Sequence, residues 1–302
     1  MRQDKPVLTV IGSYPIHINR LQLMNSYFHD LQLPSWNPYI SQVVNEMIDA
    51  QVKLISDGQT RDPFMTIFTR GLKGCQVREK TTVVEPIEFI EPITLSDLRY
   101  VRSIIPKGVK LLGLIVGPYT LSRSVINQVY DDDKELAFAF AEALKKEAEI
   151  IEPFVDMISI DEPFYANAFP DYAFDLIDTI VSSLSCPTRL HACGNVTRIV
   201  SDLLDLPVDV LSHEFTATPD LFDSFSEFPN EKKQICLGSV RSDIDRVETV
   251  DEIVDHIQRG RDLFSDRLVQ IAPDCGLRML PKTIASKKLH QLHKAIEVVY
   301  HD

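Results

Sequence analysis

The sequence lacks the features of a membrane protein or a secreted protein. None of its apolar runs is long enough to span a bilayer. The opening segment MRQDKPVLTV has no apolar stretch of the kind that a secretory signal carries. The chain has only five cysteines in 302 residues, an odd number that does not suit a disulfide framework. We therefore expect a cytoplasmic protein with reduced thiols and no contact with a membrane.

Positive charge is also scarce. The chain has 31 Lys and Arg residues against 44 Asp and Glu residues, which gives a formal net charge of −13 at pH 7. A nucleic-acid interface needs clustered Lys and Arg, so this balance argues against a nucleic-acid partner. The sequence has no low-complexity linker and no internal repeat. From its length and these absences we expect one catalytic domain that covers residues 1–302.

The chain does have eight short apolar runs, and amphipathic stretches separate them. The runs cover residues 7–13, 54–59, 110–118, 156–163, 188–194, 208–215, 234–240 and 267–276. The clearest helical patterns cover residues 132–154, 249–264 and 287–300. Nearly continuous apolar runs are typical of parallel strands that are covered on both faces. The pattern predicts an α/β fold, a (β/α)8 TIM barrel with a hairpin inserted after the second strand within residues 61–92. A doubly wound open sheet is the alternative.

Unusual polar residues gather where the predicted strands end, and the active site of a barrel lies at that end. In the segment PTRLHACGN, His191 and Cys193 share one face of a strand because successive side chains alternate. Glu214 and Cys275 follow two later strands. Nitrogen, sulfur and one carboxylate oxygen suit zinc, so we predict a zinc site formed by residues from three strands. From the residues alone, His213 is the rival of Glu214 for the ligand position on its strand.

The predicted donor set indicates a particular chemistry. Two thiolates and a carboxylate make zinc a poor activator of water, but such a zinc can hold an incoming thiol as thiolate, the nucleophile for methyl transfer to sulfur. The segment SIDEP contains two carboxylates, Asp161 and Glu162. Each could take part in general acid–base catalysis or could anchor a turn. We expect Asp161 to be the one with a role in the reaction. The remaining cysteines are interpreted as ordinary small apolar residues; they are Cys75, Cys186 and Cys236.

Seven segments resemble, in the same order, motifs of the C-terminal catalytic barrel of the cobalamin-independent methionine synthase family. They are TVIGSYP, SDGQTRD, VGPYTL, SIDEP, HACGN, VDVLSHEF and APDCGL. The resemblance implies one zinc ion, held by His191, Cys193, Glu214 and Cys275. It also implies that homocysteine is the thiol substrate.

The resemblance further implies how homocysteine is bound. Its carboxylate would meet the turn Ile11, Gly12 and Ser13, and its amino group would meet Asp161. Asp161 would act as an orienting group, since the nucleophile is the substrate thiolate and not a protein side chain. A family glutamate that also meets the amino group falls on Gln59, which keeps a hydrogen-bond acceptor and loses a charge.

The chain departs from the family where the methyl-folate donor binds. A tryptophan that packs on the folate has no counterpart in SRSVINQ, and a further glutamate falls on Asn167. The proton-donating histidine falls within SVRSDIDR, which contains no histidine. This pattern resembles the short core members of the family, which lack the additional N-terminal barrel and take the methyl group from a corrinoid. We therefore expect a methylcorrinoid donor, presented by a corrinoid carrier protein.

Three alternatives stay open. The first is a methyl-folate-dependent methionine synthase that needs a helper protein. The second is a methylcorrinoid:coenzyme M type of thiol methyltransferase, a class that shares HACG and a later cysteine but does not predict PDCGL together with SIDEP. The third is a zinc-binding scaffold without turnover.

Overall fold

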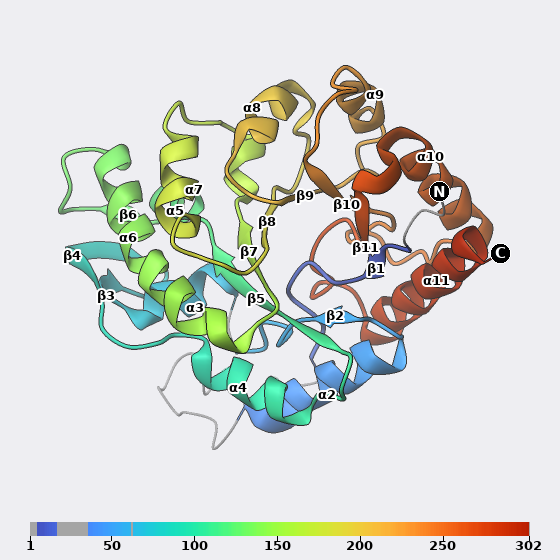
Figure 1. The fold of residues 1–302 in the computed structure, drawn as a ribbon. Coiled ribbons are helices and arrows are strands. Elements are labelled where there is room, and N and C mark those ends of the chain that lie inside the picture. The colour runs from blue at the N-terminus through green and yellow to red at the C-terminus, as the bar shows by residue number, and fades with distance from the viewer. Residues whose placement is uncertain (1–4, 17–35, 62, 302) are drawn as a thin grey trace.

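The computed structural model describes residues 5–16, 36–61 and 63–301. Its main sheet has eight parallel strands in the order β1-β11-β10-β9-β8-β7-β5-β2 (Figure 1). These strands are β1 (Val7–Leu8), β2 (Leu54–Ile55), β5 (Lys110–Val116), β7 (Met157–Asp161), β8 (Thr188–His191), β9 (Val210–His213), β10 (Gln234–Gly238) and β11 (Leu268–Ala272). Each of them lies within one of the eight predicted runs.

The first two strands in sequence bring the ends of this sheet together. Thr9 forms a parallel bridge with Leu54, and its hydroxyl donates a hydrogen bond of 2.8 Å to the Leu54 carbonyl. The sheet is therefore a barrel and not an open sheet, and the predicted (β/α)8 fold is confirmed. β1 is shorter than the predicted run, and beyond its end the carbonyls of Val10 and Ile11 accept hydrogen bonds from Arg189.

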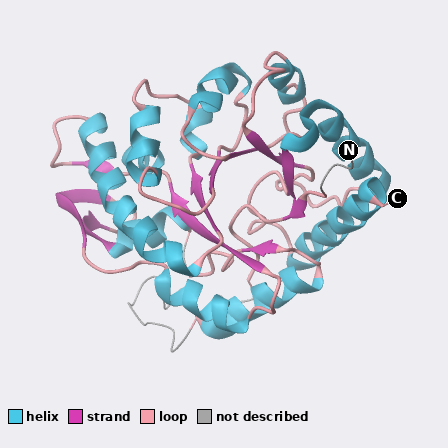
Figure 2. Ribbon diagram, in the orientation of Figure 1, coloured by secondary structure: helices cyan, strands magenta, loops and turns pink. Residues whose placement is uncertain are grey.

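Helices surround the barrel (Figure 2). They are α2 (Asn37–Asp49), α3 (Phe64–Gly71), α4 (Leu95–Ile104), α5 (Pro118–Ser124), α6 (Asp133–Ile151), α7 (Ala173–Val181), α8 (Val200–Asp205), α9 (Leu221–Ser226), α10 (Val250–Phe264) and α11 (Lys282–Tyr300). Short 3-10 turns cover Glu152–Phe154, Pro163–Ala166, Thr197–Ile199 and Ser265–Arg267. The three predicted helices are α6, α10 and the greater part of α11.

Local sequence explains where two of the long helices begin. The Asp132 side chain accepts a hydrogen bond from the backbone N–H of Glu135 and so caps α6. Thr249 and Glu252 form a reciprocal capping box at the start of α10. Each cap satisfies backbone donors that the first turn of a helix leaves free.

The predicted hairpin is present after the second barrel strand. β3 (Leu72–Gln76) pairs antiparallel with β4 (Thr82–Phe89), and β6 (Ile126–Asn127) adds a third, parallel strand to β4. Residue 62, within the range predicted for this insertion, lies outside the described residues. The small sheet lies beside α6 and α3, outside the barrel (Figure 1).

The apolar core has two parts. A large cluster fills the space between the strands and the helices, and a smaller one fills the barrel itself. The smaller cluster consists of Ile11, Leu54, Leu112, Leu114, Met157, Val210, Cys236 and Ala272. Both faces of the strands are thus covered, which explains their nearly continuous apolar sequences. Within the described ranges, no helix combines the length and the hydrophobicity needed to cross a bilayer.

Candidate metal centre

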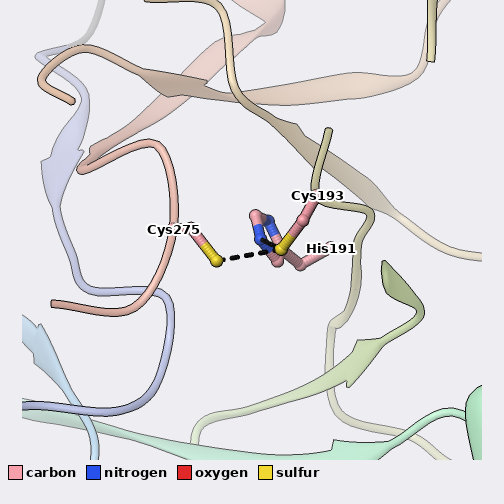
Figure 3. Close-up of side chains that lie close together, drawn as sticks. All are labelled: His191, Cys193 and Cys275. Atoms are coloured by element: carbon pink, nitrogen blue, oxygen red, sulfur yellow. Dashed lines mark hydrogen bonds between the residues drawn. The ribbon is translucent and has the colours of Figure 1, made fainter. Parts of the chain in front are cut away.

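Three predicted ligands meet at the carboxyl ends of the barrel strands (Figure 3). His191 is the last residue of β8, Cys193 follows two residues later, and Cys275 follows β11. The Nε2 atom of His191 lies 2.9 Å from the Cys193 Sγ atom, which lies 2.9 Å from the Cys275 Sγ atom. The sulfur–sulfur distance exceeds the roughly 2.05 Å of a disulfide, and both cysteines are free. All three donor atoms lie within 4.8 Å of one another, an arrangement that can hold a metal ion.

The histidine is prepared for metal binding by a hydrogen bond on its other nitrogen. Ser212, at the facing position of β9, has its hydroxyl 3.1 Å from the Nδ1 atom of His191. This contact leaves Nε2 directed at the sulfurs, as a metal-binding imidazole requires. Burial, and then the nearby charge of Arg189, lower the pKa of His191 well below its usual value. A neutral imidazole offers the lone pair that a metal needs.

The surroundings of Cys193 oppose the ionisation of its thiol. The hydrogen bond with Cys275, followed by burial, raises the pKa of Cys193 well above its usual value, and the carboxylates of Glu214 and Asp161 act in the same direction. The raised pKa keeps the Cys193 thiol protonated at neutral pH. A bound divalent cation reverses this balance, because a coordinating thiol loses its proton.

The structure distinguishes Glu214 from its rival His213. The carboxyl group of Glu214 accepts a hydrogen bond from the backbone N–H of Gly194 and contacts the Cys193 side chain. His213 points the other way: its Nδ1 atom is 3.2 Å from the Ala192 carbonyl, and its ring packs 6.0 Å from the ring of Phe225. Glu214 therefore lies beside Cys193, although the group whose donor atoms lie within 4.8 Å of one another contains only His191, Cys193 and Cys275. One imidazole, two thiols and one carboxylate form a donor set that fits zinc.

Asp274 ties together the loops that carry two of these groups. Its carboxylate oxygens accept hydrogen bonds of 3.1 Å from the Thr216 N–H and 2.8 Å from the Ala217 N–H. Asp274 precedes Cys275, and Thr216 follows Glu214 by two residues. The contacts hold the loop after β9 against the loop after β11.

Asp161 lies next to this cluster, at the end of β7. It is paired in register with His191, and the Ser159 hydroxyl donates a hydrogen bond of 3.1 Å to its Oδ1 atom. Burial raises the pKa of Asp161 to about 7, while the charge of Arg189 and the hydrogen bond from Ser159 act against that rise. The group is thus a buried carboxylate with a fixed orientation.

The turn of residues 11–13 and Gln59 lie together at the same end of the barrel. A Cβ atom on Gly12 would lie 3.1 Å from the Gln59 Oε1 atom, and the Ser13 carbonyl accepts a hydrogen bond of 2.8 Å from Leu277. The turn therefore lies between the exit of β2 and the loop that carries Cys275. Gln59 itself adopts a positive φ of 47°.

Glu162 holds the start of α5 in place. Its carboxyl group accepts hydrogen bonds of 2.9 and 2.8 Å from the backbone N–H groups of Tyr119 and Thr120, and one of 2.6 Å from the Thr120 hydroxyl. A Cβ atom on Gly117 would lie 1.9 Å from this carboxyl group, so only glycine fits there. Glu162 thus anchors the start of α5.

Ser212, Asp274 and Arg189 are parts of the site that the sequence did not single out. The signal for Arg189 was present, because a residue two positions before a strand-end ligand shares its face. For Ser212 and Asp274 the deciding contact lies on another strand, which one sequence does not reveal.

A (β/α)8 barrel with polar, chemically active groups at the carboxyl ends of its strands is the architecture of an enzyme. The comparisons with known proteins give the particular family. Residues 7–298 match the family model described as "Cobalamin-independent synthase, Catalytic domain". The chain belongs to this family and is a methyltransferase.

Individual relatives agree with this assignment. The methionine synthase of Methanocaldococcus jannaschii is 33% identical over 97% of this chain and 99% of its own length. The methionine synthase of Methanothermobacter thermautotrophicus is 32% identical over 95% of this chain and 98% of its own length. Among solved structures, a B12-independent methionine synthase from Shewanella sp. W3-18-1, in complex with selenomethionine, has the same fold. It superposes with a TM-score of 0.83 at 18% identity and covers 98% of each chain.

Proposed function

We propose that this enzyme transfers a methyl group to the thiol of homocysteine and forms methionine, with a methylcorrinoid as the donor. The observation that carries the proposal is the convergence of His191, Cys193 and Cys275 at the strand ends, with the buried carboxylate of Asp161 beside them. The similarity to archaeal methionine synthases supports the same reaction.

In this proposal a zinc ion is held by His191, Cys193, Glu214 and Cys275. When bound, zinc supplies the positive charge that lowers the pKa of a thiol and keeps it as the thiolate nucleophile. The protein's own contribution is the orientation of each donor. Ser212 fixes the ring of His191, and Asp274 holds the loop of Glu214 against that of Cys275.

The remaining residues bind the amino-acid end of homocysteine. Asp161 accepts hydrogen bonds from the α-ammonium group, the backbone of Ile11, Gly12 and Ser13 meets the carboxylate, and Gln59 offers a further acceptor. In the overall reaction, the substrate sulfur loses its proton to solvent and gains the methyl group. The methyl–cobalt bond of the donor breaks, and both electrons remain on cobalt.

The loop after β10 favours a corrinoid over methyl-folate as the donor. Arg241 in this loop forms an ion pair with Asp243, with 2.6 Å between Nη2 and Oδ2, and residues 239–246 contain no histidine. A departing folate amine needs a proton, and this segment offers no imidazole to supply it. The cobalt of a corrinoid is a good leaving group and needs no proton when the methyl group is transferred. We expect the corrinoid to be presented by a carrier protein.

The direct test mixes the purified zinc-loaded protein with homocysteine and methylcobalamin and measures methionine. We expect methionine to form without a further protein, at a rate that a cognate carrier would increase. Parallel reactions contain methyl-folate in place of methylcobalamin, or coenzyme M in place of homocysteine. Turnover with methyl-folate alone would support the folate-dependent alternative, and preference for coenzyme M would support the other thiol methyltransferase class.

A scaffold without turnover is distinguished by X-ray absorption at the zinc edge. Addition of homocysteine to the enzyme should add one sulfur to the zinc coordination shell. An unchanged shell would rule out activation of the substrate thiol by the metal.

A further inference from the structure

A positively charged side chain lies inside the barrel, directly below the candidate site. Arg189 of β8 is fully buried, and among the described residues it has no ion pair with a carboxylate. Burial of an unpaired charge is unfavourable unless hydrogen bonds compensate for the lost water. Its guanidinium makes four such bonds to oxygen. The acceptors are Ser159 Oγ at 3.1 Å, Gln270 Oε1 at 3.2 Å, the Val10 carbonyl at 3.1 Å and the Ile11 carbonyl at 3.2 Å.

One group of these contacts leads to Asp161. In the pairing of β7 with β8, Ser159 faces Arg189 and Asp161 faces His191, so the first pair forms the layer beneath the second. A guanidinium can only donate hydrogen bonds. The Ser159 hydroxyl therefore accepts from Arg189 Nε, and its own proton is directed at Asp161 Oδ1, 3.1 Å away. The second oxygen of Asp161 remains available for a cationic group.

The other group of contacts leads to the exit of β1. The Nη2 atom of Arg189 donates to the carbonyls of Val10 and Ile11, at the point where β1 has left the sheet. The Ser56 hydroxyl gives the same turn a further support, through a hydrogen bond of 2.9 Å to the Gly12 carbonyl. A single guanidinium thus connects this turn with Asp161.

We infer that Arg189 is a positioning residue that, through Ser159, makes the site selective for thiols carrying an α-amino group. This inference rests on the proposed function, in which Asp161 meets the amino group and the turn from Ile11 meets the carboxylate. Both substrate groups are attached to one carbon atom, so their protein partners must keep a fixed separation. Arg189 maintains that separation because it binds both sides.

The test compares two thiols and two matched variants. L-Homocysteine and 4-sulfanylbutanoate differ only in the α-amino group. Ser159→Ala breaks the connection between Arg189 and Asp161, whereas Ser122→Ala removes a buried hydroxyl that bonds only to a carbonyl in its own helix. Dissociation constants are measured by isothermal titration calorimetry on zinc-loaded proteins, so that no methyl donor is needed.

We expect Ser159→Ala to weaken homocysteine binding about tenfold and to leave 4-sulfanylbutanoate binding unchanged. Ser159→Thr keeps the hydroxyl and should restore homocysteine binding, and Ser122→Ala should bind both thiols as the wild type does. In turnover, the change should appear in KM for homocysteine and not in kcat.

Two results would overturn the inference. Equal weakening of both thiols by Ser159→Ala, or no weakening of either, would show that the connection does not serve the amino group, while the proposed reaction would stand. A wild-type protein that binds neither thiol would contradict the proposed function itself, and the inference with it.

Discussion

At the scale of single residues, the site depends on which face of a strand each side chain occupies. His191 and Arg189 both point into the barrel. His191 lies one layer above Arg189, so His191 contacts Ser212 and Arg189 contacts Ser159. His213, one position before Glu214, points to the helix layer instead and packs against Phe225. Alternation along β9 therefore places Glu214 at the site and His213 in the core, although His213 has the same imidazole group as the candidate ligand His191.

The two cysteines of the cluster should be essential to zinc binding. We expect Cys193→Ser and Cys275→Ser each to lose the bound zinc and the methyltransferase activity, because a serine hydroxyl is a much weaker zinc ligand than a thiolate. Zinc content by elemental analysis and methionine formation measure the two effects. Cys186→Ser is the matched control and should retain both, because Cys186 is not in the cluster. A Cys193→Ser protein with one full equivalent of zinc would contradict the ligand assignment.

The sequence predicted three positions that the structure brings together, but not the residues that support them. His191, Cys193 and Cys275 could be predicted because their chemistry is distinctive and each follows an apolar strand. Arg189 and Ser159 lie inside apolar strands, where a polar residue has no evident partner until the register between β7 and β8 is known. That register depends on packing across the whole sheet, which local sequence does not encode.

At the scale of elements, two loops must stay in contact for the metal site to form. Asp274 joins them through the N–H groups of Thr216 and Ala217. Asp274→Asn replaces one carboxylate oxygen with an amide nitrogen that cannot accept. We expect zinc affinity to fall by about tenfold or more, as is typical when a group supporting a metal ligand is changed. Competition with a chelator of known affinity measures the change.

A matched control for this prediction exists at the opposite end of the barrel. The Asp209 carboxylate accepts a hydrogen bond of 2.7 Å from the Thr188 N–H, where β8 begins. Asp209→Asn should lower the free energy of unfolding and leave zinc affinity unchanged. Equal losses of zinc affinity in both variants would mean that Asp274 acts only through general stability.

The start of α5 should make stability dependent on pH. Burial raises the pKa of Glu162 from 4.5 to about 8, which its three hydrogen bonds only partly oppose. The folded state therefore binds this proton more tightly than the unfolded chain does. The resulting stabilisation is complete below about pH 4.5 and is lost as pH rises through about 8. We expect the free energy of unfolding to fall between pH 5 and pH 8, as measured by urea denaturation.

Glu162→Gln should show a smaller decrease over the same pH range. The variant should also lose about 1–3 kcal/mol at pH 5, because its amide group faces backbone donors that it cannot satisfy. Other buried carboxyl groups are present in both proteins, so the difference between the two slopes reports Glu162. Glu142→Gln, an exposed change on α6, is the control and should behave as the wild type. Identical slopes in Glu162→Gln and wild type would refute the assignment.

At the scale of the whole molecule, the eight strands and the inserted hairpin were predictable, and two features were not. Closure of the barrel depends on the contact between Thr9 and Leu54, and no local sequence pattern predicts this contact. The addition of β6 to the hairpin joins segments separated by the whole of α4, β5 and α5. Periodicity identifies elements because burial follows it, but long-range pairing is decided by packing between elements.

Zinc should stabilise the folded protein without being required for the fold. The proposed ligands lie at the ends of β8, β9 and β11, whereas the large apolar cluster is complete without them. We expect removal of zinc by a chelator to lower the free energy of unfolding by about 2–4 kcal/mol, through loss of binding to the folded state alone. Thermal unfolding measures this loss, and far-UV circular dichroism should show an unchanged fold. Collapse of the far-UV signal on chelation would contradict the prediction.

The pairing of β1 with β11 has a consequence for biosynthesis. A nascent chain leaves the ribosome amino end first, yet the ladder of β1 is formed with a strand that starts at Leu268, and on its other side the first strand contacts only the short β2. The amino-terminal strand therefore cannot form its ladder with β11 until almost all of the polypeptide has been translated. Nascent chains arrested before β11 should therefore be protease-sensitive around Val7 and Leu8, and the loop bearing Cys275 would arrive only in the final seconds of elongation.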